Sequence, residues 1–341
     1  MSDGEQSDLD ETICEETKPS FVLSIDGGGF RGLSCLLVIA HLMQEIGLAV
    51  NEDDPPRPYQ VFDLICGTST GGLIAILLGR FGLSCDEAIE VYREIGTTMF
   101  NGEADAGKIW GNIIHGEQFS SAIFEKKLEE IVARYTGSKD TLVKPPKTSP
   151  DTHYHESTQT FVTVVSRVGS AGVDAYRIRS YPRPLDDIDP SPYGHKWSIF
   201  EAIRGTCAAP MYLSPLKVQQ GHGIFVFQDA GFSGFNNPST VALDEAEKLF
   251  GLDADIKLIS LGTGLRSLVG EGKHPGTSQD VKDEDIKSVV QMILNSVSTV
   301  AKNAKNAPQL ARRVAKQLLE VATDTELTHL HTYEQFDREY N

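Results

Sequence analysis

The stretch FVLSIDGGGFRG, residues 21–32, defines the first element of the fold. Its apolar run, 21–25, predicts a short buried strand, and the glycines after Asp26 predict a tight turn. Residues 33–46 follow with the composition of a buried helix. Backbone N–H groups at a glycine turn before a helix can bind an anion, either a phosphate or the oxyanion of a tetrahedral intermediate. Arg31 adds a positive charge to this turn.

A second strand followed by a glycine turn is predicted within residues 59–72. Residues 59–66, YQVFDLIC, have the composition of a strand, and the residues from Gly67 to Gly71 have the pattern Gly-x-Ser-x-Gly. Between a strand and a helix, such a serine sits on a sharp turn with its hydroxyl exposed. The two glycines leave room for the crowded backbone of that turn. Ser69 is therefore a candidate nucleophile, and Gly67 and Gly71 would form the turn around it.

An acidic residue follows a predicted strand farther along the chain, where residues 223–228 precede Asp229-Ala-Gly231. A carboxylate at the end of a strand can point into the sheet edge where active sites form. A free aspartate has a pKa of about 3.9 and is a weak base at neutral pH. Asp229 could therefore act as general base to a serine only if it lies close to that serine and is desolvated, which raises its pKa.

Strands and helices alternate along most of the chain, which predicts an α/β fold with a largely parallel sheet. Further strands are expected at 160–166, 174–180 and 256–261, and further helices at 73–78, 87–96, 118–135, 198–204, 241–250 and 283–322. We expect an acidic tail over 1–20 to be disordered and residues 21–341 to form one domain. That domain includes a polar surface insertion at 144–159 and a helical C-terminal part at 283–341.

Charge and composition exclude several classes of function. The 341 residues carry 31 Lys and Arg against 48 Asp and Glu, a formal net charge of −17, whereas binding to nucleic-acid phosphates needs a basic surface. The acidic N-terminus lacks the basic and then apolar pattern of a secretory signal. The longest apolar runs, 33–43 and 73–78, are too short to span a bilayer. The five cysteines show no metal-binding spacing, which favours free thiols in a reducing compartment, so we expect a cytoplasmic protein.

Taken together, the three motifs resemble those of the patatin-like phospholipase family, in particular its intracellular fungal and plant types. That family combines Asp-Gly-Gly-Gly-x-Arg-Gly, Gly-x-Ser-x-Gly and a later Asp-Gly or Asp-Ala-Gly. Here the three occur in this order at 26–32, 67–71 and 229–231. Shorter similarities lie at 204–212, 236–238 and 260–264. The resemblance implies a three-layer α/β fold whose central, mostly parallel sheet is flanked by helices.

The resemblance also implies a site and an activity. Ser69 would be the nucleophile and Asp229 its base, a dyad without histidine. The oxyanion hole would be formed by residues of the glycine turn, namely the N–H groups of Gly28 and Gly29 with help from Gly27 and Arg31. The implied activity is that of a lipid acyl hydrolase of the phospholipase A type, which cleaves fatty acyl esters of membrane glycerolipids through an acyl-enzyme. No metal or other cofactor is implied.

A lipid hydrolase also needs an apolar rim for contact with a membrane or micelle. Transient peripheral membrane contact is therefore expected, because the net charge of −17 does not favour docking on anionic lipid. The candidate rim residues are apolar side chains near the predicted site, namely Phe30, Met99, Phe100, Trp110, Met211 and Tyr212.

Three other functions stay open. A Ser-Asp-His hydrolase needs a histidine after the acid, and His274, His329 and His331 are the histidines that follow Asp229. A sugar kinase of the actin-like fold would use the glycine turns to hold phosphate, but it leaves Gly-Thr-Ser-Thr-Gly without a role. A non-catalytic interaction domain of the same fold would keep the motifs without using them.

Overall fold

The structure is a computed structural model that describes residues 19–50, 54–101, 121–144, 158–166, 175–182, 195–210, 212–220 and 223–263. Several sequence predictions fall outside these residues. They concern nearly all of the 1–20 tail, most of the 144–159 insertion and the whole of the 283–341 part.

A mixed seven-stranded sheet forms the centre of the protein, with strand order β5-β6-β3-β2-β1-β7 and β4 paired with β3. The strands are β1 (Ser20–Ile25), β2 (Leu64–Thr68), β3 (Gln159–Ser166), β4 (Ala175–Arg179), β5 (Leu216–Gln220), β6 (Gly223–Asp229) and β7 (Ile256–Leu261). β7, β1, β2 and β3 run parallel to one another. β4 and β6 pair antiparallel with β3, and β5 pairs antiparallel with β6. The predicted α/β fold is confirmed, but the sheet is mixed rather than largely parallel, with three parallel and three antiparallel pairings among the described strands.

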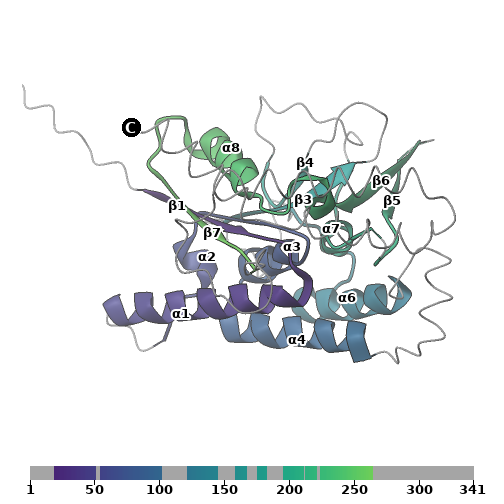
Figure 1. Ribbon diagram of the computed structural model, residues 1–341, viewed down its shortest axis with the longest axis horizontal. Helices are drawn as coiled ribbons and strands as arrows, with labels where there is room; N and C mark the ends of the chain where they lie inside the picture. Colours follow the sequence, from purple (N-terminus) through teal and green to yellow (C-terminus); the bar gives the residue numbers. More distant parts are fainter. Residues whose placement is uncertain are drawn as a thin grey trace, which may run out of the picture.

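Helices cover both faces of the sheet and complete a three-layer structure (Figure 1). They are α1 (Gly32–Val50), α2 (Pro58–Val61), α3 (Thr70–Ala75) with a π-helical continuation (Ile76–Arg80), α4 (Cys85–Asn101), α6 (Ser121–Thr136), α7 (Ile199–Thr206) and α8 (Ser239–Phe250). In Figure 1, α1 and α4 run below the sheet and α8 lies above it. Side chains of a strand alternate between the two faces. In β1, Leu23 and Ile25 therefore enter the larger core, which contains α1 and α4, whereas Val22 packs under α8.

The structure corrects one local prediction and adds one strand. The predicted strand 59–66 is wrong in its first half, because Pro58–Val61 forms α2 and β2 begins at Leu64. Pro58 occupies the start of α2, where a missing N–H is tolerated, and the Gln60 side chain accepts a hydrogen bond of 2.7 Å from the Arg57 N–H. β5 was not predicted; it is a short edge strand that forms an antiparallel pair with β6.

The first helix is longer than the predicted 33–46, because it continues to Val50. The helical stretch Gly29–Val50 is long and apolar enough to cross a membrane by length and composition, with a mean hydropathy of 1.8, so the expectation based on 33–43 was wrong for this stretch. In the fold, one face of α1 is buried and the other is exposed. Buried side chains include Cys35, Leu36 and Ile39, and exposed ones include Leu37, Val38 and Leu48.

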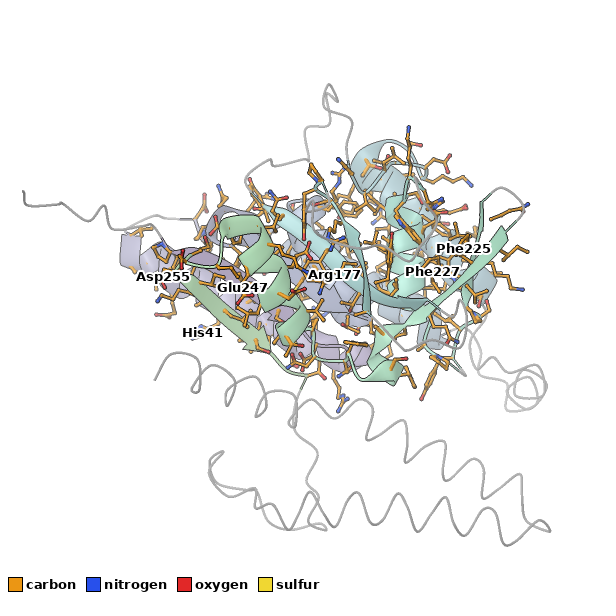
Figure 2. All side chains as sticks on the ribbon, turned by 90° about the horizontal axis from the view of Figure 1, so that it is seen from above. His41, Arg177, Phe225, Phe227, Glu247 and Asp255 are labelled. Carbon is orange, nitrogen blue, oxygen red and sulfur yellow. The ribbon has the colours of Figure 1, made fainter. Side chains whose placement is uncertain are left out.

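A buried ion cluster joins α8 to β4. The Glu245 side chain on α8 is fully buried and accepts hydrogen bonds from Arg179 and, at 2.7 Å, from the Tyr181 hydroxyl. Arg177 adds an ion pair of 3.2 Å to the same carboxylate, and Figure 2 shows Arg177 beside α8. A carboxylate that is buried with its cations contributes little net stability, but removing one partner leaves an uncompensated charge.

We predict that Glu245→Ala lowers the free energy of unfolding by about 3–5 kcal/mol, because Arg179 stays buried without its carboxylate. Urea unfolding followed by circular dichroism measures the change. Lys248→Ala is the matched control on the same helix, since it removes only the exposed pair with Asp244 and should cost less than about 0.5 kcal/mol. Equal changes in the two variants would contradict the prediction.

Candidate active site

Ser69 lies on a sharp turn between β2 and α3. Its backbone has φ 57° and ψ −129°, and it has the one positive φ among the described residues other than glycine. A backbone held in such a region costs about 1–3 kcal/mol and persists only where the surrounding structure enforces it. The Ser69 side chain is half-buried, so it remains accessible from solvent. This strand–turn–helix arrangement is the setting that the Gly-x-Ser-x-Gly pattern predicted.

The two glycines of this turn are required by space. A Cβ atom built on Gly67 would overlap the backbone of Gly71, and one built on Gly71 would overlap the carbonyl oxygen of Ile25. The turn is therefore packed against itself and against the carboxyl end of β1. Larger residues at either position would push the turn away from that end.

The backbone of Ser69 is held from α7. The Ser69 N–H donates a hydrogen bond of 2.9 Å to the Thr206 hydroxyl, and that hydroxyl donates at 2.9 Å to the carbonyl of Thr163 on β3. Thr206 thus ties the strained residue to two neighbouring elements. The sequence reasoning assigned no role to Thr206, although it lies in the 204–212 run noted for its family similarity.

Strand β3 brings Asp229 to Ser69. On β3, Thr163 pairs with Thr68, the residue before Ser69, and the next residue, Val164, pairs with Asp229 at the end of β6. Two loops that are distant in the sequence therefore meet at consecutive positions of one strand. The Ser69 side chain lies near enough to the Asp229 carboxylate to lower its pKa as a hydrogen-bond donor.

The Asp229 carboxylate is buried, with 1% of its surface exposed. Burial raises the pKa of Asp229 from its ordinary 3.8 to about 7, although hydrogen bonds from Ser69 and from the Gly231 N–H oppose the rise. The Gly231 N–H lies 2.8 Å from Asp229 Oδ1. A carboxylate with a pKa near neutrality is poised to accept a proton from a neighbouring hydroxyl. The desolvation that a serine base would need is therefore present at Asp229.

The glycine turn after β1 faces the same place. The Gly28 N–H donates to the Thr70 hydroxyl at 3.3 Å, and Thr70 directly follows Ser69. Gly29 has φ +58°, a left-handed conformation that favours glycine. Its carbonyl accepts a hydrogen bond from the hydroxyl of Tyr92 on α4. The turn is thus held from two sides, and one of its N–H groups points toward the residues around Ser69.

Two members of the predicted oxyanion hole lie differently from the expectation. The Gly27 N–H donates at 3.1 Å to the carbonyl of Asn236, so it is not available to an oxyanion, and Gly27 contributes by shaping the turn. Arg31 lies at the end of a short 3-10 helix (Gly29–Arg31) with its side chain exposed. The sequence could not show these differences, because they depend on which loop lies beside the turn.

The remaining candidates are only partly placed. Phe30 is 44% exposed and packs against Gly96 on α4, whereas Tyr212 is half-buried. The other rim candidates lie outside the residues whose side chains are described, namely Met99, Phe100, Trp110 and Met211. His274, His329 and His331 also lie outside the described residues. Within those residues, no three His, Cys, Asp or Glu side chains are grouped to hold a metal ion.

Comparison with known families agrees with the three motifs and the fold. Residues 23–243 match the family model described as patatin-like phospholipase. The match covers more than half of the 341 residues, so the chain belongs to the patatin-like phospholipase family. The fold is the α/β fold of this family.

Individual relatives carry related names. The human protein named calcium-independent phospholipase A2-gamma is 30% identical over 251 residues, covering 71% of this chain and 28% of that protein. Phospholipase A I of Arabidopsis thaliana is 26% identical over 289 residues, covering 71% of this chain and 20% of that protein. A third relative, also from Arabidopsis thaliana, is named probable inactive patatin-like protein 9. It is 25% identical over 301 residues, covering 84% of this chain and 70% of that protein. The chain thus spans less than a third of the two phospholipases.

The pKa of Asp229 predicts how the reactivity of Ser69 depends on pH. Covalent labelling of Ser69 by a fluorophosphonate should be slow below pH 6, rise through a midpoint at about 7 and level off above it, because only the deprotonated carboxylate accepts the proton. Labelling is measured by intact-protein mass spectrometry over short times. A rate that stays at its plateau down to pH 5 would contradict the raised pKa. Asp229→Asn should remove the pH-dependent limb.

The hydrogen bond from Ser69 to Thr206 predicts a stability difference between two variants. Thr206→Val should lower the free energy of unfolding by about 1–3 kcal/mol, because it leaves the Ser69 N–H without its acceptor. Thr206→Ser keeps the hydroxyl and should lose clearly less. Denaturant titration of both variants measures the difference. A loss in Thr206→Val that is no larger than the loss in Thr206→Ser would contradict the importance of this hydrogen bond.

Proposed function

We propose that this protein is a lipid acyl hydrolase of the phospholipase A type, with Ser69 as nucleophile and Asp229 as general base. The observation that carries the proposal is that β3 brings Ser69 beside the buried Asp229 carboxylate, whose pKa is raised to about 7. This arrangement suits a serine nucleophile, because a serine hydroxyl is a weak nucleophile until a neighbouring base takes its proton. Membership of the patatin-like phospholipase family supports the assignment.

The reaction follows from the positions of these groups. Asp229 takes the proton of Ser69 as Oγ attacks the carbonyl carbon of a fatty acyl ester, and the electron pair of the carbonyl moves to its oxygen. The tetrahedral intermediate collapses when the ester oxygen leaves as an alcohol with the proton from Asp229. Water then attacks the acyl-serine while Asp229 accepts its proton, and the second tetrahedral intermediate collapses as that proton returns to Ser69 Oγ and the fatty acid is released.

The negative charge that develops on the substrate oxygen needs donors that are already aimed at it. The N–H groups of Gly28 and Gly29 are proposed for this role, since the turn that carries them lies beside Thr70. The long contact of 3.3 Å between the Gly28 N–H and the Thr70 hydroxyl is one that an oxyanion can replace. Arg31 adds a positive charge at the mouth of the site rather than a buried donor.

The proposed substrates are membrane glycerolipids, reached by transient peripheral contact. Phe30 follows the proposed oxyanion donors and is partly exposed, so it is proposed to meet the acyl chains. The cytoplasm is the proposed location. The four cysteines within the described residues, Cys35, Cys66, Cys85 and Cys207, are free and buried, as expected for a reducing compartment.

A non-catalytic role is the second candidate, because a relative is named probable inactive patatin-like protein 9. Both Ser69 and Asp229 are present in this chain, which favours catalysis. The two candidates differ in one measurement, the release of fatty acid from lipid.

We predict that the wild-type chain releases free fatty acid from a mixed glycerolipid panel, that EDTA leaves the rate unchanged, and that Ser69→Ala abolishes release. Asp229→Asn should reduce the rate by at least about 10³-fold, because the proton of Ser69 then has no acceptor. Mass spectrometry of the extracted lipids measures the product.

The control for this experiment is Ser138→Ala, which removes an exposed serine remote from the site and should release fatty acid at the wild-type rate. Full activity in Ser69→Ala would contradict the proposed nucleophile. Loss of release in wild type and all variants, with folding intact, would favour the non-catalytic role.

A further inference from the structure

The carbonyl of Gly27 is held by two side chains from distant parts of the chain. Asn236 Nδ2 donates to it at 3.3 Å, and the Thr263 hydroxyl donates at 3.1 Å. Both donors are buried, with 4% of each residue exposed. Asn236 lies in the loop between Asp229 and α8, and Thr263 lies just after β7. A single carbonyl therefore receives donors from the ends of two other elements.

This carbonyl belongs to the same peptide group as the Gly28 N–H. A peptide group is planar and trans, so its C=O and N–H point in opposite directions. Fixing the carbonyl of Gly27 therefore fixes the direction of the Gly28 N–H. That N–H lies 3.3 Å from the Thr70 hydroxyl, on the side where Ser69 is located.

We propose that Asn236 and Thr263 are positioning residues that aim the Gly28 N–H at the oxyanion of the reaction. The inference rests on the proposed function, since it assigns these residues to the oxyanion hole of that reaction. Neither side chain touches the reacting atoms. Each acts through the peptide group between Gly27 and Gly28.

The packing around both glycines supports a direct mechanical connection. A Cβ atom on Gly27 would lie 2.5 Å from Asn236 Oδ1 and 2.9 Å from the Cβ of Ser69. A Cβ atom on Gly28 would overlap the Thr263 side chain. Asn236 and Thr263 thus lie against the two α-carbons of the peptide group whose carbonyl they bind. Rotation of this peptide group would require both side chains to move.

Asn236 also connects the oxyanion side of the site to the base. Its backbone carbonyl accepts the Gly27 N–H at 3.1 Å, and a Cβ atom on Gly231 would lie 2.9 Å from its Oδ1. Gly231 in turn donates its N–H to Asp229. The turn that carries the proposed base and the turn that carries the proposed oxyanion donor are therefore built around one side chain.

The two hydrogen bonds to the Gly27 carbonyl also strengthen the Gly28 N–H as a donor, which adds to the effect of fixing its direction. A carbonyl that accepts two hydrogen bonds is polarised, and hydrogen bonds in a chain strengthen one another, so the N–H at the other end of the peptide group becomes a better donor. A better and correctly aimed donor matters when charge develops on the substrate oxygen, not when the neutral ester binds. Loss of either side-chain donor should therefore lower kcat and leave KM nearly unchanged.

The test compares Thr263→Val, which keeps the shape and removes the hydroxyl, with Thr263→Ser, which keeps the hydroxyl. Removing one direct oxyanion donor costs about 10²–10³-fold in kcat. Loss of an aiming contact should cost less, on the order of 10-fold in Thr263→Val with unchanged KM. Thr263→Ser should recover most of the loss. Thr97→Val is the control, since it removes an exposed hydroxyl whose hydrogen bond is to the carbonyl of Glu94 on the same helix, α4.

A second readout separates aiming from general loosening of the structure. A trifluoromethyl ketone with an acyl chain adds to Ser69 and carries an oxyanion, whereas an ether analogue of the lipid binds without developing charge. Thr263→Val should weaken binding of the ketone by the same 10-fold factor and leave binding of the ether analogue unchanged. Asn236→Asp, which replaces the amide donor with an acceptor, should show the same selectivity with a larger loss.

The outcomes distinguish the inference from the function on which it rests. Equal kcat and equal ketone affinity in wild type and Thr263→Val, with Ser69-dependent turnover intact, would overturn the inference alone. Equal weakening of the ketone and the ether analogue would also overturn it, because the effect would then be structural. Absence of Ser69-dependent turnover in wild type would overturn the proposed function and the inference together.

Discussion

Strand β3 is the template on which the site is assembled, because the ends of β2 and β6 pair with its consecutive residues Thr163 and Val164. This pairing brings together Ser69 and Asp229, which lie in loops far apart in the sequence. A shift of one residue in the register would turn every side chain of the strand to the opposite face of the sheet. The registers of β2 and β6 on β3 therefore determine whether a nucleophile and a base meet at all.

The arrangement has a thermodynamic cost that the rest of the fold must offset. The pKa of Asp229 is raised from 3.8 to about 7 in the folded chain, so protonation of this carboxyl favours folding. Its contribution to stability is fully present below pH 3.8 and is lost as the pH rises through 7. Since each pKa unit corresponds to about 1.4 kcal/mol, the loss is on the order of 4 kcal/mol, to which the strained backbone of Ser69 adds about 1–3 kcal/mol. Packed cores on both faces of the sheet supply the compensating burial of apolar surface.

The sequence allowed much of the fold and of the candidate site to be predicted, for reasons that are local. Gly-rich turns after apolar runs identified the ends of β1 and β2, and the Asp-Ala-Gly run identified the end of β6. The prediction failed where a local signal was ambiguous or absent. YQVF at 59–62 has a strand-like composition, but Pro58 starts a helical turn there. Asn236 and Thr263 lay within runs noted for family similarity, yet no spacing rule could connect them to Gly27, because the contacts cross the sheet edge between separate loops.

By itself, the sequence determined the turns. Short-range steric and chemical requirements, which can be read along the chain, identify the glycines at 27–29, 67 and 71 as turn residues. They also identify Ser69 and Asp229 as candidate site residues. The tertiary structure alone decided which groups act on one another. In the fold, the Gly27 N–H donates to the carbonyl of Asn236, and the Ser69 N–H donates to the Thr206 hydroxyl. Asp229 is buried deeply enough to raise its pKa. Burial and hydrogen-bond partners depend on elements that are distant in the sequence, so desolvation and the aim of a peptide N–H arise only when the sheet brings those elements together.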